Sequence, residues 1–287
     1  MIPNVDNDSL VYLNGERVRL RDAKVSVLDR GFIFGDGVYD VVPAYDGKPL
    51  RMHAHLARLE RSLEAVRIPC DLTRADWERI VLELVEGSGL ADCVVYIQVT
   101  RGVARRDHAF PEGVEPTVFC MVSPFTRPDE RLRQQGLSAV SLPDERWLRC
   151  NIKSVSLLGN VLARQAAIDA GVDDVIQFRG GHLTEGSAAN IWVVRNGTLL
   201  APPRDELILE GIRYGLMEEL ADRCGIPFEA RPVTEAEVAS TDELMLTSAT
   251  KEVLPITRYN GQAVGSGLPG PVYARLRAAY DAVIAAL

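Results

Sequence analysis

The chain has 287 residues, of which 47% are apolar and 25% are charged. This composition excludes disordered and fibrous proteins, and the length allows two ordinary globular domains. The formal net charge of -8 argues against non-specific binding to nucleic acid or anionic membranes, because both depend on a basic surface. We therefore expect small molecules and further copies of the chain as partners.

The N-terminus and the cysteines indicate an intracellular protein. The first residues, MIPNVDNDSL, are polar and acidic, whereas a signal peptide carries a basic segment followed by an apolar one. No window holds the ~18 consecutive apolar residues of a membrane-spanning helix. The five cysteines are scattered without a C-x-x-C pair, and there are four histidines. We expect a cytoplasmic location, reduced cysteines and no metal site.

The first quarter of the chain is predicted to form β-hairpins. The Asn-Gly pair at 14–15 and the Asp-Gly pair at 46–47 supply the positive-φ residues that tight hairpin turns need. Apolar runs such as VYL and YDVVPAY flank these turns. A sheet is therefore expected to open the protein.

Two helices and two further strands are expected to complete this domain. Helical spacing of leucines begins at His53 and a similar pattern recurs over 76–86. The runs CVVYIQVT (93–100) and TVFCMV (117–122) are short, β-rich and continuously apolar, which predicts central strands. Residues 1–123 are thus predicted to form a small α+β domain.

A linker and a larger second domain are predicted beyond this point. Residues 124–133 lose periodicity and contain prolines, which is typical of a linker. The predicted second domain, 134–287, contains a helix over 157–170 and hairpins around Gly-Gly at 180–181 and Asn-Gly at 196–197. A further helix and strand and a closing helix follow, so the expected fold class is α+β.

One of the four lysines is a candidate catalytic residue. Lys153 lies in RWLRCNIKSVSLLGN, between polar residues and an apolar helical run. Lysine amines that are partly buried or lie near cations become nucleophiles, and such lysines hold aldehyde cofactors as Schiff bases. Arg146 and Arg149 supply nearby cations. A surface lysine is the commoner interpretation of the isolated pattern, and Lys251, beside a Ser/Thr turn, is the main competitor.

A carboxylate in a turn is the second candidate. Glu185 lies in LTEGSAANIW, before a Gly-Ser turn and between two predicted strands. The pyridine nitrogen of pyridoxal phosphate stays protonated when a carboxylate lies opposite it, and Glu185 could fill that position. A plain turn residue is the alternative interpretation.

Two segments could bind a phosphate group. Gly211 begins a predicted helix, whose free N–H groups and dipole suit a dianion, and Ser248 to Thr250 follow a strand with further donors. Arg58, on the helix after His53, could add a charge-assisted contact. Each signal is common in proteins and gains weight only from the others.

A basic loop is the last candidate. TRGVARRDHAFP (100–111) places three arginines and a histidine after a glycine turn, an arrangement that can bind a carboxylate through a bidentate guanidinium. A solvated basic loop is the alternative interpretation.

Taken together, these segments resemble the branched-chain and D-amino-acid aminotransferase family, the fold type IV group of pyridoxal phosphate enzymes, and within it the D-amino-acid branch. The resemblance implies a small N-terminal α/β sandwich and a larger β-barrel-like domain with helices. The segments that carry it are DRGFIFGDGVYDVV, RWLRCNIKS with LLGN, LTEGSAAN, ILEGIRYG and ELMLTSATKE.

The resemblance also implies site residues. Lys153 would carry pyridoxal 5'-phosphate, Glu185 would face its pyridine nitrogen and Leu209 would lie against the ring. The implied phosphate contacts are Arg58, Gly211, Ile212, Arg213, Ser248, Ala249 and Thr250. The implied substrate contacts are Tyr39, Val41, Arg106 and His108, the last two acting across the interface of a homodimer.

The implied activity is ping-pong transamination between D-amino acids such as D-alanine and 2-oxo acids such as 2-oxoglutarate, with Lys153 also moving the α-proton. Two positions depart from the family pattern, because Arg213 and Ala249 replace small hydroxyl residues. Phosphate binding is therefore expected to depend more on charge and backbone donors.

Four alternatives share the implied fold or cofactor. They are an aminodeoxychorismate lyase, an L-branched-chain aminotransferase, an (R)-selective amine transaminase and a pyridoxal phosphate-binding protein without turnover. Fold-level likeness does not separate them.

Overall fold

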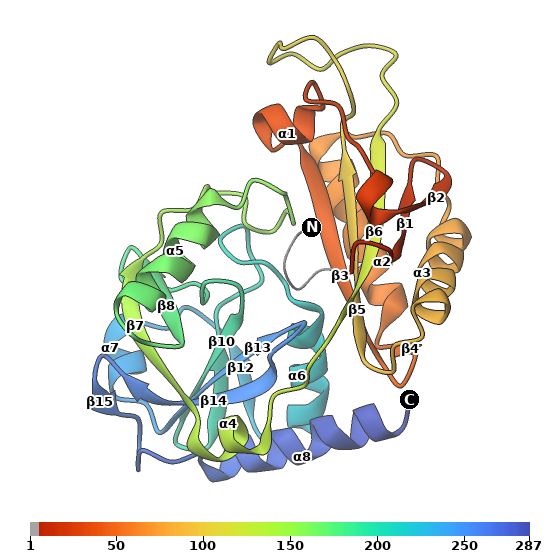
Figure 1. Cartoon of the computed structure of the whole chain (residues 1–287). Coiled ribbons are helices and arrows are strands. Elements are labelled where there is room, and N and C mark those ends of the chain that lie inside the picture. Colours follow the sequence, from red (N-terminus) through yellow and green to blue (C-terminus); the bar gives the residue numbers. More distant parts are fainter. Residues whose placement is uncertain (1–5) are drawn as a thin grey trace. The chain divides into compact units, whose positions relative to one another are not determined.

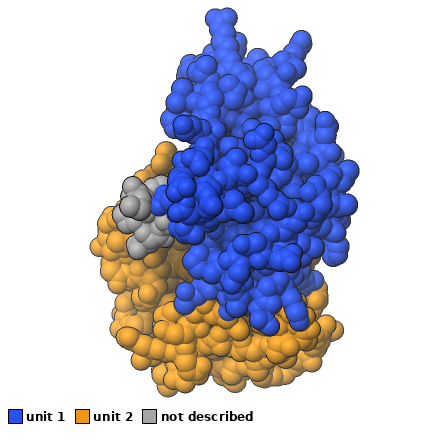
Figure 2. All heavy atoms as spheres, turned by 45° about the vertical axis from the view of Figure 1, so that its right-hand side comes forward, with its two compact units in different colours: residues 1–126, 152–157 blue, residues 127–151, 158–287 orange. Residues whose placement is uncertain are grey.

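The computed structural model describes residues 6–287. The chain divides into two compact units, shown in two colours in Figure 2. The first comprises the described residues up to Thr126 together with Ile152–Leu157, and the second comprises Arg127–Asn151 and Leu158–Leu287. The step from Thr126 to Arg127 falls within 124–133, and the segment that carries Lys153 belongs to the first unit.

The first unit is built on an antiparallel six-stranded sheet with the order β2-β1-β6-β5-β3-β4 (Figure 1). Its strands are β1 (Leu10–Leu13), β2 (Glu16–Arg19), β3 (Gly37–Tyr45), β4 (Lys48–Pro49), β5 (Cys93–Thr100) and β6 (Thr117–Pro124). Tight turns at 14–15 and 46–47 have positive φ at both residues and join β1 to β2 and β3 to β4. The predicted hairpins and central strands are therefore confirmed.

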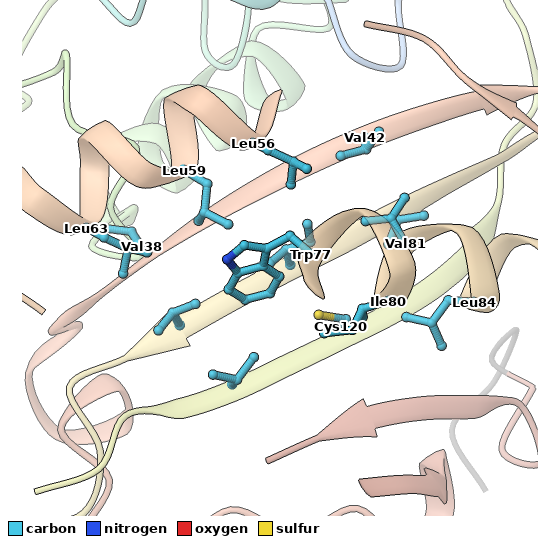
Figure 3. Packing of buried hydrophobic residues seen from close by; sticks show 14 of the residues in the cluster. Val38, Val42, Leu56, Leu59, Leu63, Trp77, Ile80, Val81, Leu84 and Cys120 are labelled. Atoms are coloured by element: carbon cyan, nitrogen blue, oxygen red, sulfur yellow. The ribbon is translucent and has the colours of Figure 1, made fainter. Parts of the chain in front are cut away.

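Two helices, α2 (Met52–Val66) and α3 (Arg74–Ser88), cover one face of this sheet. Trp77 of α3 points into the layer between the helices and the strands, near Leu59 of α2 (Figure 3). Alternate residues of β5, from Cys93 to Val99, are buried on this side, whereas Tyr96 and Gln98 are only half-buried. The opposite face of the sheet thus keeps polar side chains accessible.

One short helix of this unit was not expected from the sequence. Helix α1 (Arg30–Phe34) begins where the Asp29 side chain accepts a hydrogen bond from Gly31 N, and it ends at Gly35, which has a left-handed conformation. The Asp29 carboxylate also accepts hydrogen bonds from the hydroxyls of Thr100 and Thr117 on β5 and β6. Contacts with distant strands therefore determine where this helix begins, and the local sequence pattern does not reveal those contacts. A short 3-10 helix, η1 (Leu20–Asp22), precedes it.

The second unit contains a nine-stranded mixed sheet, with β15 paired to β14 beside the path β12-β11-β10-β13-β14-β7-β8-β9. Its strands are β7 (Leu137–Pro143), β8 (Asp174–Arg179), β9 (His182–Leu183), β10 (Asn190–Arg195), β11 (Thr198–Ala201), β12 (Phe228–Ala230), β13 (Glu243–Ser248), β14 (Glu252–Tyr259) and β15 (Gln262–Ala263). Its helices are α4 (Glu130–Gln135), α5 (Leu158–Asp169), α6 (Ile212–Arg223), α7 (Glu235–Ala239) and α8 (Pro271–Ala285). Helix α4 begins inside the segment predicted to be a linker.

This sheet is curled into a half-barrel. Strand β12 forms one edge and β9 the other, yet Leu183 N of β9 donates to Val233 O, only three residues beyond the end of β12. Three residues span at most ~10 Å, whereas a flat sheet would separate these edges by roughly 34 Å at a spacing of about 4.8 Å per strand. The two edges must therefore approach each other.

Within residues 6–287, no helix combines the length and apolar character needed to cross a membrane. The same part of the chain contains no group of three or more side chains placed to hold a metal ion. All five cysteines are free thiols, and Cys93, Cys120 and Cys150 are buried.

Candidate active site

Lys153 of the first unit lies on an extended segment beside β3. Tyr39 N donates to Lys153 O at 2.9 Å, and Lys153 N donates to Ser62 Oγ of α2 at 3.3 Å. Both main-chain groups of Lys153 are therefore fixed, and with them the direction of its side chain. The ammonium nitrogen Nζ lies 4.2 Å from the centre of the Tyr39 ring.

The competing lysine has a different environment. Lys251 Nζ forms an ion pair with Asp174 Oδ2 at 2.5 Å, both in the second unit. The ion pairs found among residues 6–287 do not include Lys153. A carboxylate neutralises Lys251, and this pairing favours Lys153 as the reactive amine.

Arg58 is held by a buried carboxylate of β3. Its Nε and Nη2 donate to the two oxygens of Asp40, each at 2.9 Å, and His55 Nδ1 lies 2.7 Å from Asp40 Oδ1. Burial alone would raise the pKa of Asp40, but the charges of Arg58 and His55 hold it well below its usual range. This buried network, which the sequence did not predict, fixes the guanidinium next to the strand that carries Tyr39.

Tyr39 and Val41 point to the face of the sheet opposite Asp40, where β5 contributes Tyr96 and Gln98. The rings of Tyr39 and Tyr96 have centroids 5.7 Å apart, and Tyr96 OH donates to Gln98 Oε1 at 2.7 Å. Burial and the neighbouring Tyr39 raise the pKa of Tyr96 to about 12. At neutral pH the Tyr96 hydroxyl on this face is therefore protonated.

The basic loop is fastened to α1. Arg30 Nη1 donates to Asp107 O at 2.5 Å, and Arg30 Nε forms an ion pair with Asp36 at 2.8 Å. Phe34 of α1 lies under the loop, 5.3 Å from the His108 ring and 5.5 Å from the Arg106 guanidinium carbon. Arg106 and His108 themselves are exposed. The buried Arg30, which the sequence analysis did not single out, thus holds the main chain between them.

Glu185 of the second unit is buried in the turn between β9 and β10. Its carboxylate binds the Arg146 guanidinium and accepts a hydrogen bond from Asn190 Nδ2 at 3.2 Å. Arg146 also binds Asp144 through two hydrogen bonds of 2.9 Å. Burial would lower the pKa of Arg146, but Asp144 and Glu185 outweigh it and raise that pKa. The sequence suggested Arg146 as a cation for Lys153, whereas its ion pairs are with these two acids.

Asn190 connects the Glu185 turn to the segment before α6. Its Nδ2 also donates to Leu209 O at 2.8 Å. A Cβ atom at Gly211 would lie 2.2 Å from Asn190 Oδ1, so any larger residue there would force the Asn190 amide to move. The predicted residues Glu185, Leu209 and Gly211 are therefore brought together around one amide that the sequence analysis missed.

The second predicted phosphate turn begins next to Asn190. Strands β10 and β13 pair Asn190 with Thr247, and Ser248 ends β13. Ser248 Oγ accepts a hydrogen bond from Lys251 N at 3.0 Å, which closes the turn that contains Ala249 and Thr250.

Helix α6 begins at Ile212 without a capping side chain, because Gly211 is its N-cap residue. Its first N–H groups are thus available as donors for an anion. The Arg213 side chain is buried, and its Nε donates to Tyr280 OH of α8 at 3.0 Å. The Arg213 charge was expected to help bind the phosphate. Its Nε instead points toward α8.

The sequence model of the family described as amino-transferase class IV matches residues 37–259. The chain belongs to this family. The D-alanine aminotransferase of Staphylococcus epidermidis strain RP62A is 37% identical over 275 residues, which cover 96% of this chain and 97% of the relative. The predicted family membership is confirmed.

Solved structures of class IV aminotransferases share the fold. The branched-chain amino acid aminotransferase of Escherichia coli has a TM-score of 0.91 at 23% identity, covering 96% of this chain and 94% of that one. The T.th. branched-chain enzyme solved with pyridoxamine 5'-phosphate has a TM-score of 0.90 at 24% identity, with coverages of 97% and 95%. The predicted fold type IV architecture is confirmed.

Class IV aminotransferases are pyridoxal phosphate-dependent transaminases, and the residues of this chain suit that cofactor. The uncapped start of α6 and the Ser248 hydroxyl are donors for a phosphate dianion. Glu185 is a buried carboxylate of the kind that faces a pyridine nitrogen, and Lys153 provides an amine without a carboxylate partner in the described chain.

Replacing Gly211 by alanine should displace the Asn190 amide and weaken cofactor binding. Loss of the Asn190 hydrogen bonds to Glu185 and Leu209 should weaken the free energy of cofactor binding by about 2 kcal/mol. The dissociation constant for pyridoxal phosphate should then rise roughly 30-fold. Titration of the cofactor-free protein measures this. Gly215→Ala, in open space on the same helix, is the control and should leave the constant unchanged. Equal effects of the two substitutions would contradict the steric argument.

Asp40→Asn should lower the free energy of unfolding by about 3 kcal/mol at pH 7, because Arg58 loses its buried counter-charge. The lowered folded-state pKa means that ionised Asp40 stabilises the protein above its unfolded pKa of about 4, and that this stabilisation is lost as the pH falls further. Urea unfolding should show a smaller difference between the two proteins at pH 3 than at pH 5. A difference that stays constant down to pH 3 would contradict this assignment.

Proposed function

We propose that this aminotransferase transfers amino groups between D-amino acids such as D-alanine and 2-oxo acids such as 2-oxoglutarate, in a ping-pong cycle. The observation that carries the proposal is the basic loop, whose main chain Arg30 holds through hydrogen bonds to Asp107 O and His108 O. Arg106 and His108 form an exposed, positioned pair that suits a substrate carboxylate. The curated relative that shares 37% identity bears the name D-alanine aminotransferase, which supports the same substrate class.

Lys153 is the proposed catalytic residue. Its fixed main chain and its position above the Tyr39 ring suit an amine that holds the cofactor covalently and then carries the substrate α-proton. Bound pyridoxal phosphate supplies an electron sink for this proton transfer. Arg58, Gly211, Ile212, Arg213 and the turn from Ser248 to Thr250 are the proposed phosphate contacts, with the main chain serving at Ile212 and Arg213.

Glu185 is proposed to face the pyridine nitrogen, with Leu209 against the ring. The Arg146 guanidinium and the Asn190 amide would keep the Glu185 carboxylate in one orientation. This arrangement suits a carboxylate that must hold a proton on the ring nitrogen throughout the cycle.

Stereochemistry would follow from where the substrate carboxylate is held. Tyr39 and Val41 line the accessible face of the first sheet, beside the amine of Lys153. A carboxylate fixed by Tyr39, Arg106 and His108 leaves only one enantiomer with its Cα–H directed at that amine. The D form is expected because the relative that shares 37% identity is named D-alanine aminotransferase.

A homodimer is part of the proposal. Exposed apolar side chains on α5 follow helical spacing and would be covered by a second copy; they are Leu158, Val161, Leu162 and Ile168. In the first unit, Phe32 of α1 is also an exposed apolar side chain, with 76% of its surface accessible. We propose that Arg106 and His108 act in the site of the partner. A cytoplasmic location stays a prediction of the sequence.

The substrate class is tested by incubating the protein with 2-oxoglutarate and either D-alanine or L-alanine. Pyruvate should form from D-alanine at least about 100-fold faster than from L-alanine, because the carboxylate contacts select one enantiomer. Pyruvate from L-alanine alone would overturn the proposal. Release of 4-aminobenzoate from aminodeoxychorismate without a 2-oxo acid would instead favour the lyase.

Lys153→Ala should abolish the visible absorbance band of the lysine-bound cofactor and lower kcat/KM for D-alanine by at least about a thousandfold. Lys24→Ala, at an exposed lysine that is not among the predicted site residues, is the control and should keep both. A band that survives in Lys153→Ala would refute the assignment of the reactive amine.

A further inference from the structure

Two turns of the second unit carry the proposed cofactor contacts, and one ion pair joins them. The Glu185 turn spans 184–189 and the Ser248 turn spans 248–251. We infer that Lys251 and Asp174 are positioning residues that hold these two turns in register for the cofactor. The inference rests on the proposed function, because it assigns the two turns to opposite ends of the same cofactor.

The Asp174 carboxylate holds the Glu185 turn. Asp174 is the first residue of β8 and is fully buried. Its Oδ1 accepts a hydrogen bond from Ser187 N at 3.0 Å, two residues after Glu185. Its Oδ2 accepts from Lys251 Nζ at 2.5 Å. One buried carboxylate therefore contacts both turns.

Lys251 holds the Ser248 turn from its other side. Its main-chain N donates to Ser248 Oγ, while its side chain reaches Asp174. Because this N–H uses Ser248 Oγ as an acceptor, the hydroxyl proton of Ser248 is directed elsewhere and can be donated to a phosphate oxygen. Lys251 thus fixes the position of the Ser248 hydroxyl and leaves that hydroxyl as a donor to the proposed phosphate.

The residue after Lys251 fixes the end of the same turn. Glu252 is fully buried with a left-handed φ of 54°, a conformation that is costly for glutamate. Its carboxylate binds Arg277 of α8 at 2.7 Å and Arg127 at 2.9 Å. Because the Glu252 end of the turn is held in this way, the Lys251 side chain contacts Asp174 from a fixed position.

Other contacts keep the Glu185 turn folded without Lys251. Gln177 Nε2 donates to Gly186 O and Asn160 Nδ2 donates to Ser187 O, both at 2.7 Å. Removing the Lys251 ammonium would therefore leave the Glu185 turn folded but break the side-chain link between the two turns. The Asp174 carboxylate would also lose the charge that offsets its burial; burial raises its pKa, and Lys251 and Ser187 together outweigh that effect and lower it.

Lys251→Met tests this inference, because methionine keeps the apolar stem and removes the charge. Cofactor-free protein is titrated with pyridoxal phosphate, and the visible band and the ³¹P resonance of the bound cofactor are recorded. The dissociation constant should rise about tenfold, and the ³¹P resonance should move because the Ser248 turn is no longer tied to Asp174 and the Glu185 turn. Lys251→Arg should restore the constant to within about threefold, and Lys24→Met should match the unmodified protein.

Unchanged affinity and an unchanged ³¹P resonance in Lys251→Met would overturn the inference. A lower unfolding temperature of the cofactor-free variant, without either change, would overturn it too, since the ion pair would then serve stability alone. If the unmodified protein bound no pyridoxal phosphate, the cofactor contacts themselves would be wrong. A protein that shows the Lys251 effect but fails to use D-alanine would refute only the proposed substrate.

Discussion

Three buried carboxylates organise the two units of this protein, and each of the three is tolerated because a cation lies against it. Asp40 is paired with Arg58, Glu185 with Arg146 and Asp174 with Lys251. Removing one partner of such a pair leaves an uncompensated charge away from water, at a cost of about 3–5 kcal/mol. The electrostatic cost of separating the charges therefore keeps each pair in one geometry. The neighbouring main chain, which carries the proposed site residues, is held in position with it.

Much of the fold could be predicted because its signals are local. The Asn-Gly and Asp-Gly turns, the apolar strands 93–100 and 117–122, and the helix that starts after Gly211 all appear at the expected places. The family resemblance named the cofactor, which the comparisons bear out. The roles of the individual site residues stay predictions, although the second unit brings Glu185, Leu209 and Gly211 together around Asn190.

The partners of those residues could not be predicted, because they come from distant parts of the sequence. Asp40 is 18 residues from Arg58, and Arg146 is 39 residues from Glu185. Nothing in a local pattern distinguishes these ion pairs from solvated surface charges. The same reason explains why α1 was not predicted. Its capping residue, Asp29, is held in position by hydrogen bonds from Thr100 and Thr117 on distant strands.

The path of the chain has a consequence for how the two units can be separated. The first unit takes back Ile152–Leu157 after the chain has entered the second, so the polypeptide passes from one unit to the other three times. A protease that cleaved only within 124–133 would leave two fragments, of which the N-terminal one lacks the segment hydrogen-bonded to Tyr39 and Gly37 of β3. Neither unit is thus a contiguous module that recombination could exchange by a single crossover, and any crossover between Tyr45 and Lys153 would separate the lysine from its supporting strand.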